Sequence, residues 1–301
     1  MSTFSSETSK NNDRVGAQHA APLRITRWLI VAALLMAAVL ISLYAITAPP
    51  GLTWEHGGVD GGELAVVSAR LGVAHPPGYG LYTLLGGLFI RLPLPGTPIQ
   101  HLQILSHLLA LLSCALTGLA ARRLAADNRL PLPNVVGLVA ALTLGLSRTF
   151  WSQAIIAEVY TLSLAFFCAG LLLSVDWSKQ VPSPRTLFAG GFLLGMAATH
   201  HLTTVLWLPG LLWLARRSLR SWTWRGWLAL VIGGIVGLWP WLWLMLRGGA
   251  DPAANWGGVD GGLSEFWAHI TGQQYNVYLN DPSPGALING IGNWAKSLPV
   301  E

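Results

Sequence analysis

The sequence predicts an all-α integral membrane protein with about seven transmembrane helices and two further helices at the membrane surface. Three observations predict this fold: 52% of the residues are hydrophobic, only 10% are charged, and apolar runs recur along the chain. An ordinary soluble domain carries about 25% charged residues, so this chain lacks the polar side chains to cover a water-facing surface. We therefore expect lipid to surround most of it.

A polar N-terminal segment precedes the first apolar run. Residues 1–23 are rich in Ser, Asn and Thr, and we interpret them as a disordered cytoplasmic tail. The run 28–47 spans 20 residues, which is enough to cross a bilayer, whereas the apolar core of a secretory signal is usually about 7–15 residues long. We predict that this run is the first transmembrane helix and that Ala48-Pro49-Pro50 ends it.

Six further apolar runs follow, and with the first they give seven spans in a module over residues 24–246. Three of them are short for a full crossing, so we expect them to extend into their semi-polar flanks or to tilt little. The six runs are 99–120, 134–146, 155–175, 187–199, 202–214 and 226–246.

The loop 48–98 contains two short helical patterns on either side of a rigid break. Residues 62–71 form an amphipathic pattern with Leu64 and Val67 on one face. The break at Pro76-Pro77-Gly78 follows, and residues 79–92 then form a second apolar pattern. Whether 79–92 crosses the membrane decides the side on which every later loop lies.

The distribution of basic residues favours two helices at the outer membrane surface. If 79–92 does not cross, 13 of the 18 basic residues fall on one side, in four segments that hold four, three, two and four of them. A crossing at 79–92 would reverse this bias. Cytoplasmic loops are enriched in Lys and Arg, so we expect a cytoplasmic N-terminus and an outer loop 48–98. The four cytoplasmic segments would be 1–27, 121–133, 176–186 and 215–225.

The last segment, 247–301, is polar and rich in Gly, Pro, Asn and Trp. We expect it to lie outside and to belong to a truncated chain, since no final helix follows. The hexapeptide Gly-Gly-Val-Asp-Gly-Gly occurs at 57–62 and again at 257–262. The flanking residues do not match, so we interpret the recurrence as a coincidence of loop composition.

Several classes of protein are disfavoured. Cys114 and Cys168 lie inside apolar runs, where free cysteines are small buried hydrophobes. The chain has no basic, aromatic-interleaved patch that would indicate a nucleic-acid partner. It also lacks a P-loop, a Gly-x-Gly-x-x-Gly turn, a His-Glu-x-x-His pair and a Gly-x-Ser-x-Gly elbow.

Asp60 and Glu63 are the first candidates for chemistry. They are three residues apart at the start of the first surface helix, which places both carboxylates on one side. A carboxylate at a low-dielectric boundary can have a raised pKa and act as a general base. The alternative is that Asp60 caps the helix and Glu63 is an ordinary first-turn acid.

Three further polar residues are expected near the outer boundary. His75 precedes two prolines, so it is either a rigidly held functional imidazole or part of a simple corner. Arg148 and Glu158 flank a turn over 147–160. A carboxylate entering lipid is costly unless paired, so Glu158 is a functional candidate or the partner of Arg148.

Two more groups of residues are candidates for substrate contacts. His200 and His201 join two short helices, and one of them is expected to contact a phosphate or acceptor, with interfacial packing as the alternative. A metal site shared by the two is disfavoured because adjacent residues on a helix point in different directions. Trp256, Gln273 and Tyr275 lie in the last segment, where they anchor the chain at the interface or form a stacking platform for a sugar.

The motif Asp60-Gly61-Gly62-Glu63, followed by the segment LGVAHPPGY at 71–79, resembles the first outer loop of one membrane family. That family is the protein O-mannosyltransferase-like branch of the GT-C glycosyltransferases, formerly known only as a domain of unknown function. Shorter similarities lie at 149–154, 157–160, 195–201, 255–257 and 271–275.

The chain departs from the family pattern at two places. Gly80 stands where a proline usually follows, and Gly258-Val259 stands where Asp-Pro is usual. The second departure puts a role for an acid in the last loop in doubt, unless Asp260 substitutes for it.

The resemblance implies an inverting transfer of a mannose-like sugar from a polyprenyl-phosphate-type lipid donor to a protein or glycan hydroxyl. Asp60 would be the base and Glu63 a positioning group. Arg148, His75, His200 and His201 would contact the leaving phosphate. The remaining substrate-binding candidates are Tyr79, Glu158, Trp256, Gln273 and Tyr275. A divalent metal held by the carboxylates stays open, and no cofactor is assigned.

Two alternatives to a transferase remain at this stage, namely a transporter or flippase of a lipid-linked substrate and a non-catalytic truncated membrane protein. The charged residues cluster at the predicted outer ends of the helices and not along their interiors, which favours an interfacial enzyme. We expect it in a plasma membrane of bacterial type.

Overall fold

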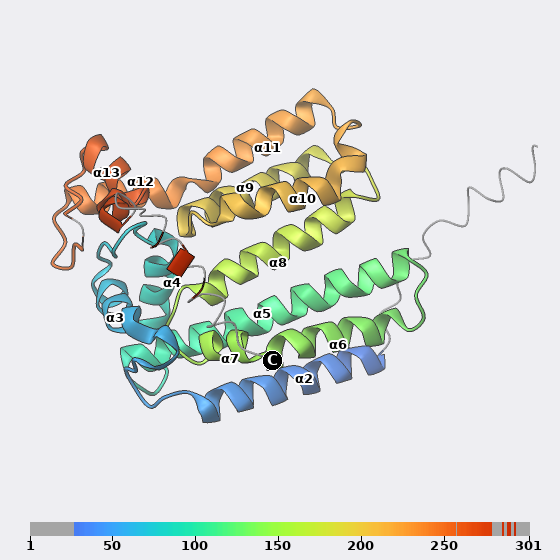
Figure 1. Cartoon of the computed structure of the whole chain (residues 1–301), viewed down its shortest axis with the longest axis horizontal. Coiled ribbons are helices and arrows are strands. Elements are labelled where there is room, and N and C mark those ends of the chain that lie inside the picture. Colours follow the sequence, from blue (N-terminus) through green and yellow to red (C-terminus); the bar gives the residue numbers. More distant parts are fainter. Residues whose placement is uncertain (1–26, 257, 279–284, 286–287, 290–291, 293–301) are drawn as a thin grey trace, which may run out of the picture. The chain divides into compact units, whose positions relative to one another are not determined.

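The computed structural model describes residues 27–256 and 258–278, together with 285, 288–289 and 292 (Figure 1). The predicted tail 1–23 and most of the end of the last segment lie outside these residues. The contacts divide the chain into Met1–Val39 and Leu40–Glu301, and the fold below is that of the second unit. Helix α2 (Arg27–Thr47) runs across the division between them.

The described residues are helical apart from turns, loops and one isolated β-bridge, which confirms the predicted all-α class. Among the described residues, four helical segments are long and apolar enough to cross a membrane, with α11 and α12 counted as one, or five if the bent pair α6–α7 is also one span. The count of seven stays a prediction. The helices that follow the predicted runs are α2, α5 (Pro98–Asp127), α6 (Pro133–Leu146), α8 (Tyr160–Trp177), α9 (Pro184–His200), α10 (Thr204–Leu219) and α11 (Trp224–Gly237) with α12 (Trp239–Gly249).

The starts of these helices follow from their sequences. Thr97 and Gln100 form a capping box at the start of α5. The Ser183 hydroxyl accepts the Thr186 amide in the first turn of α9. Helices α5, α6 and α9 each have a proline in the first turn, where its missing N–H costs nothing.

Two predicted runs differ from the structure, each for a local reason. The run 155–175 becomes helical only at Tyr160, because residues 155–159 form a buried connection after the short helix α7 (Arg148–Ala154). The run 226–246 is divided at Leu238 between α11 and α12, where Pro240 lies in the first turn of α12 and cannot continue the hydrogen bonds of α11.

Helices α9 and α11 approach closely because glycines face each other. A Cβ atom at Gly191 would lie 2.0 Å from the Leu230 carbonyl oxygen, and one at Gly233 would lie 2.1 Å from that of Phe188. No larger residue fits at these positions. Small residues that let two backbones meet are typical of helix packing in membranes.

The two short helices of the first loop are α3 (Gly61–Arg70) and α4 (Gly80–Ile90), close to the predicted bounds. Eleven residues of α4 rise about 16 Å, whereas the hydrocarbon core is about 30 Å thick, so α4 cannot cross it alone. Leu64 and Val67 of α3 pack with Tyr82 of α4 and Leu102 of α5 in one buried cluster. This cluster fixes the position of the α3–α4 loop.

Within the second unit, the short elements gather at one end of the long helices. Figure 1 shows α3, α4, α12 and α13 (Leu263–Ile270) at this end, and the turns after α5, α8 and α10 at the other. The arrangement agrees with the division of loops inferred from charge. Which end faces the cytoplasm stays a prediction.

Candidate active site

The start of α3 and the segment after it bring Asp60, Glu63 and His75 together. Leu71, in the left-handed conformation (φ 50°), ends α3 and turns the chain back. Both oxygens of Glu63 then accept hydrogen bonds from His75: Oε1 from its backbone amide at 2.6 Å, and Oε2 from Nδ1 at 2.9 Å. This contact fixes the ring, and its Nε2 lies 3.8 Å from Oδ2 of Asp60.

The cluster is strongly polarised. Burial lowers the pKa of His75, but the hydrogen bond to Glu63, the charge of Glu63 and the charge of Asp60 outweigh it, so that the pKa is raised. His75 therefore stays protonated to a higher pH than a free imidazole. Asp60 occupies the cap position of α3, yet its side chain makes no capping hydrogen bond. The predicted alternative of a capping side chain is thus wrong, although Asp60 does occupy the cap position. Its carboxylate is half-exposed.

Glu158 is buried behind this cluster, in the connection between α7 and α8. Its side chain is 1% exposed, Oε2 accepts the Val159 amide at 3.2 Å, and Oε1 has no hydrogen-bond partner in the described part of the chain. Burial, followed by the charge of Asp60, raises its pKa to about 7. Arg148 is exposed at the start of α7 and forms no ion pair with Glu158, so the predicted alternative of a structural pair is wrong.

Tyr79 connects the cluster to the histidines at the end of α9. Its ring centroid lies 5.2 Å from that of His75, 5.9 Å from His200 and 6.0 Å from His201. His200 is fully buried and its Nε2 donates to the Val159 carbonyl at 3.0 Å. His201 is less buried and its Nδ1 contacts the Thr203 hydroxyl at 2.8 Å. Both predicted histidines thus lie beside Tyr79.

The last segment joins the first loop through a short backbone pairing. Val73 donates to the Ala254 carbonyl at 2.8 Å and accepts from the Trp256 amide at 2.9 Å. This pairing brings the last segment to the chain just before His75. The Trp256 side chain is 57% exposed, and Tyr275 is 40% exposed.

The other candidates of the last segment fall into two groups. Burial above all raises the pKa of the Tyr79 hydroxyl, and Tyr275 makes the smallest of the charge contributions, after Tyr160, Asp60 and Glu158. Gln273 is exposed at the start of the short 3-10 helix Gln273–Tyr278, with no hydrogen bond to the cluster. Asp260 is exposed and its Oδ1 accepts the Gly262 amide at 2.8 Å, so it forms a turn and does not substitute for an acid at the cluster.

His269 is a residue that the sequence did not single out for this site. It is buried in α13, and its Nε2 lies 3.1 Å from the position a Cβ would take at Gly78. Burial above all lowers the pKa of His269 to about 4. The charge of His75 lowers this pKa further, and the charge of Glu63 opposes the shift. A lone histidine on the buried face of a helix gives no sequence signal of a contact almost two hundred residues away.

Within the described part of the chain, Asp60, Glu63 and His75 form a group that could hold a metal ion, since each offers a ligand atom and these atoms lie within 4.8 Å of one another. One imidazole with carboxylates suits borderline divalent cations such as Zn²⁺ and Mn²⁺. Both oxygens of Glu63 already accept hydrogen bonds from His75, so the free metal-ligand atoms are those of Asp60 and, when His75 is neutral, its Nε2. An anionic group that binds here would meet these same atoms.

The chain resembles known proteins over most of its length. Residues 60–224 match the family described as the N-terminal domain of protein O-mannosyl-transferase TMEM260. The chain is 28% identical to protein O-mannosyl-transferase TMEM260 of Mus musculus over 243 residues, and 26% identical to that of Dictyostelium discoideum over 280 residues. These alignments cover 79% and 86% of this chain, which spans about a third of the length of each relative (33%).

One solved structure shares the fold. It is the S. cerevisiae protein O-mannosyltransferase Pmt1-Pmt2 complex bound to the sugar donor, with a TM-score of 0.52 and 14% identity. The match covers 78% of this chain and 35% of that one. At this identity the likeness concerns the fold, and it agrees with the helical membrane architecture described above.

Proposed function

The chain belongs to the family of the protein O-mannosyl-transferase TMEM260 N-terminal domain, and from this membership we propose that it transfers a mannose-like sugar from a polyprenyl-phosphate-type donor to an acceptor hydroxyl at the membrane surface. The names of the relatives suggest the sugar and a protein acceptor. The observation that carries the proposal is the convergence of Asp60, Glu63 and His75 at the start of α3.

Asp60 is the general base in this proposal. Its carboxylate is half-exposed and accepts no hydrogen bond from a side chain in the described part of the chain, whereas both Glu63 oxygens are held by His75. Asp60 takes the proton of the acceptor hydroxyl as that oxygen bonds to C1 of the sugar. The bond from C1 to the lipid-phosphate oxygen breaks, its electron pair leaves with the phosphate, and the configuration at C1 is inverted.

The leaving phosphate needs donors or a cation beside it. The raised pKa of His75 favours its protonated form. Tyr79 lies next to this ring, and His201 lies on Tyr79. Glu63 holds His75 in place and is a positioning residue. His200, whose Nε2 is already bonded to Val159, fixes Tyr79 from behind.

The substrate-binding roles of Glu158, Trp256, Gln273 and Tyr275 are proposals as well. Glu158 presents an unpartnered oxygen from the buried side, which suits a sugar hydroxyl. The exposed rings of Trp256 and Tyr275 suit stacking on a sugar or acceptor. Gln273 adds an exposed amide. Arg148 is exposed at the start of α7, and we propose that it contacts the lipid headgroup region.

We propose that the cluster faces the outer side of a plasma membrane of bacterial type, with the N-terminus in the cytoplasm. The basic residues near the turns after α5, α8 and α10 support this orientation. Introduced cysteines at exposed Glu55 and exposed Ser221 test it with an impermeant thiol reagent. Labelling of Glu55→Cys alone in intact cells is expected, and labelling of Ser221→Cys alone would reverse the orientation.

A transfer assay in reconstituted vesicles tests the reaction itself. We expect radiolabelled mannose from a polyprenyl-phosphate donor to appear on a Ser/Thr-containing acceptor peptide. Movement of intact donor between leaflets without transfer would instead identify a transporter. Absence of both, with a folded protein, would leave a non-catalytic membrane protein.

A further inference from the structure

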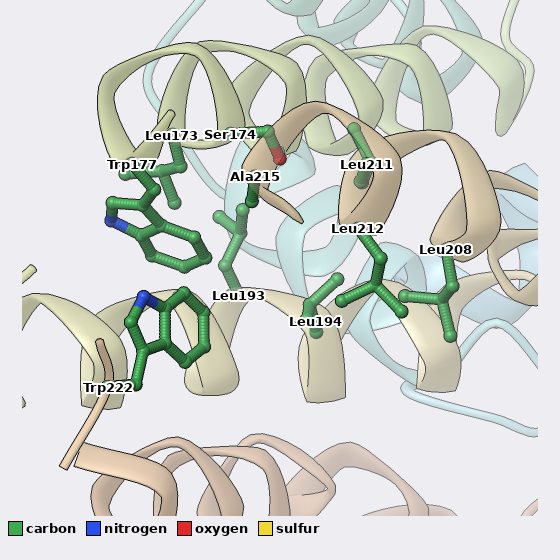
Figure 2. Close-up of a pocket in the computed structure, with 12 residues that line it drawn as sticks. Leu173, Ser174, Trp177, Leu193, Leu194, Leu208, Leu211, Leu212, Ala215 and Trp222 are labelled. Carbon is green, nitrogen blue, oxygen red and sulfur yellow. The ribbon is translucent and has the colours of Figure 1, made fainter. Parts of the chain in front are cut away.

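An apolar cavity opens between α8, α9 and α10, towards the end of these helices that is remote from the candidate active site (Figure 2). The empty space between these helices is about 400 Å³, much of it open to the surroundings and not enclosed. Leucines from all three helices form its walls. They are Leu173, Leu193, Leu194, Leu208, Leu211 and Leu212.

The walls of this cavity determine what can fill it. A cavity lined by leucines offers water no hydrogen-bond partners, so it stays dry. Leu212 lines it and is 47% exposed on the outside of α10, where the surrounding solvent is lipid. A hydrocarbon chain entering from the bilayer is therefore the occupant that buries the most apolar surface at the least cost.

One edge of the cavity is polar. Trp177 and Trp222 meet edge to face at 5.5 Å between ring centroids, and Figure 2 shows both indole nitrogens on the side away from the leucines. The Trp222 nitrogen donates to Ser218 Oγ at 3.2 Å. Trp177 is 7% exposed, and its nitrogen has no hydrogen-bond partner in the described part of the chain. A buried unpaired donor is costly, and a lipid phosphate or ester oxygen would satisfy it.

Basic residues cluster in the sequence near Trp222, at the polar edge of the cavity. Four arginines of α10, α11 and the turn between them are close in sequence to the lining residues Ala215 and Trp222, and all four are exposed. None of them forms an ion pair with a described carboxylate, since Asp127 and Asp176 pair with basic residues elsewhere. The four are Arg216, Arg217, Arg220 and Arg225. This charge complements an anionic headgroup.

We propose that the cavity is a binding site for a two-chain anionic phospholipid. One acyl chain lies among the leucines, the headgroup phosphate lies beside Arg216 and Arg220, and the unpaired Trp177 nitrogen donates to a lipid oxygen. The site does not depend on the proposed transfer, because it shares no residue with the cluster around Asp60.

Native mass spectrometry of the purified chain tests the proposal. We expect one phosphatidylglycerol to be retained at least about tenfold more than phosphatidylcholine of the same chain length. Arg216→Gln with Arg220→Gln should weaken this retention roughly 30-fold, because each basic residue near an anionic surface contributes about a factor of 5. Leu193→Trp, which fills the cavity and leaves the charges unchanged, should also abolish retention.

Arg70→Gln with Arg129→Gln is the matched control, because it removes two exposed basic residues that lie outside α8, α9 and α10. This double variant should retain phosphatidylglycerol like the wild type, and thermal unfolding should show that all the variants are folded. Equal retention of the two lipids, or undiminished retention by the Arg216/Arg220 double variant, would overturn the proposal. Retention of a single-chain polyprenyl phosphate in preference to phosphatidylglycerol would also overturn it.

Discussion

The hexapeptide Gly-Gly-Val-Asp-Gly-Gly occurs at 57–62 and at 257–262, and in the described residues its two copies have opposite orientations. In the first copy Val59 is 56% exposed and Asp60 turns towards His75. In the second copy Val259 is fully buried, and Asp260 is exposed and accepts a hydrogen bond from the Gly262 amide within a turn. The same residues thus acquire different chemistry from what packs against them.

The surroundings explain this difference. The second copy packs Val259 against Leu244 and Phe266, which forces the next side chain outwards. The first copy leads into α3, whose Glu63 holds His75 opposite Asp60. If this comparison is right, substitutions in the two copies must have very different consequences.

The largest difference is expected between Asp60→Asn and Asp260→Asn. General-base catalysis contributes roughly 10²–10⁴-fold, so Asp60→Asn should reduce transfer at least about a hundredfold in the vesicle assay. Asp260→Asn, which makes the same change in the same hexapeptide, should leave transfer within about twofold. Equal losses in the two variants would show that the copies do not differ in function.

A smaller effect is expected from Glu63→Gln, with exposed Glu265→Gln of α13 as its control. Glu63 raises the pKa of His75, so its loss should lower that pKa and shift the alkaline limb of the pH–rate profile to lower pH. The rate should fall roughly tenfold. An unmoved alkaline limb in Glu63→Gln would contradict a protonated His75 at the phosphate.

The buried Glu158 predicts a pH-dependent effect on stability. Its pKa of about 7 in the fold lies above that of an unfolded glutamate, so the fold retains a proton that the unfolded chain loses. Stability therefore falls as the pH rises towards about 7. Glu158→Gln lacks this penalty, and its Tm should exceed that of the wild type at pH 8 by roughly 2–4 °C, with no gain at pH 4.

The equality of the two Tm values at pH 4 is the internal control for this variant. A constant difference across the whole pH range would mean that Glu158 has the same pKa in the folded and the unfolded chain, and would contradict its raised pKa.

The smallest effect is expected from Arg148→Gln. Arg148 is exposed and pairs with no described carboxylate, so transfer should change by less than about twofold. A loss of tenfold or more in the same assay would bring Arg148 into the reaction centre.

The fold could be predicted from the sequence where apolar length and proline position dominate. The bounds of α3 and α4 follow from the pattern of 62–71 and from the break at Pro76-Pro77. The non-helical connection 155–159 could not be predicted, because Ile155-Ile156-Ala157 is equally typical of a buried helix and of a buried loop.

The site was predictable in part, for a similar reason. Asp60, Glu63 and His75 are near each other in sequence, and a rigid turn brings them together. The division of roles between the two carboxylates depends on hydrogen bonds that no spacing encodes. His269 reaches Gly78 through the packing of α13, and such a long-range contact leaves no local signal.

The most direct test of the account is an experimental structure of the chain with a non-transferable donor analogue, in which the distance from the Asp60 carboxylate to C1 of the sugar is measured. In the transfer step the base lies within about 3 Å of the acceptor oxygen, and that oxygen lies about 3 Å from C1. The Asp60 carboxylate must therefore lie about 6 Å or less from C1. We predict this separation, with the donor phosphate beside His75. A donor bound with C1 more than about 10 Å from Asp60, or with its phosphate away from His75, would contradict the assignment.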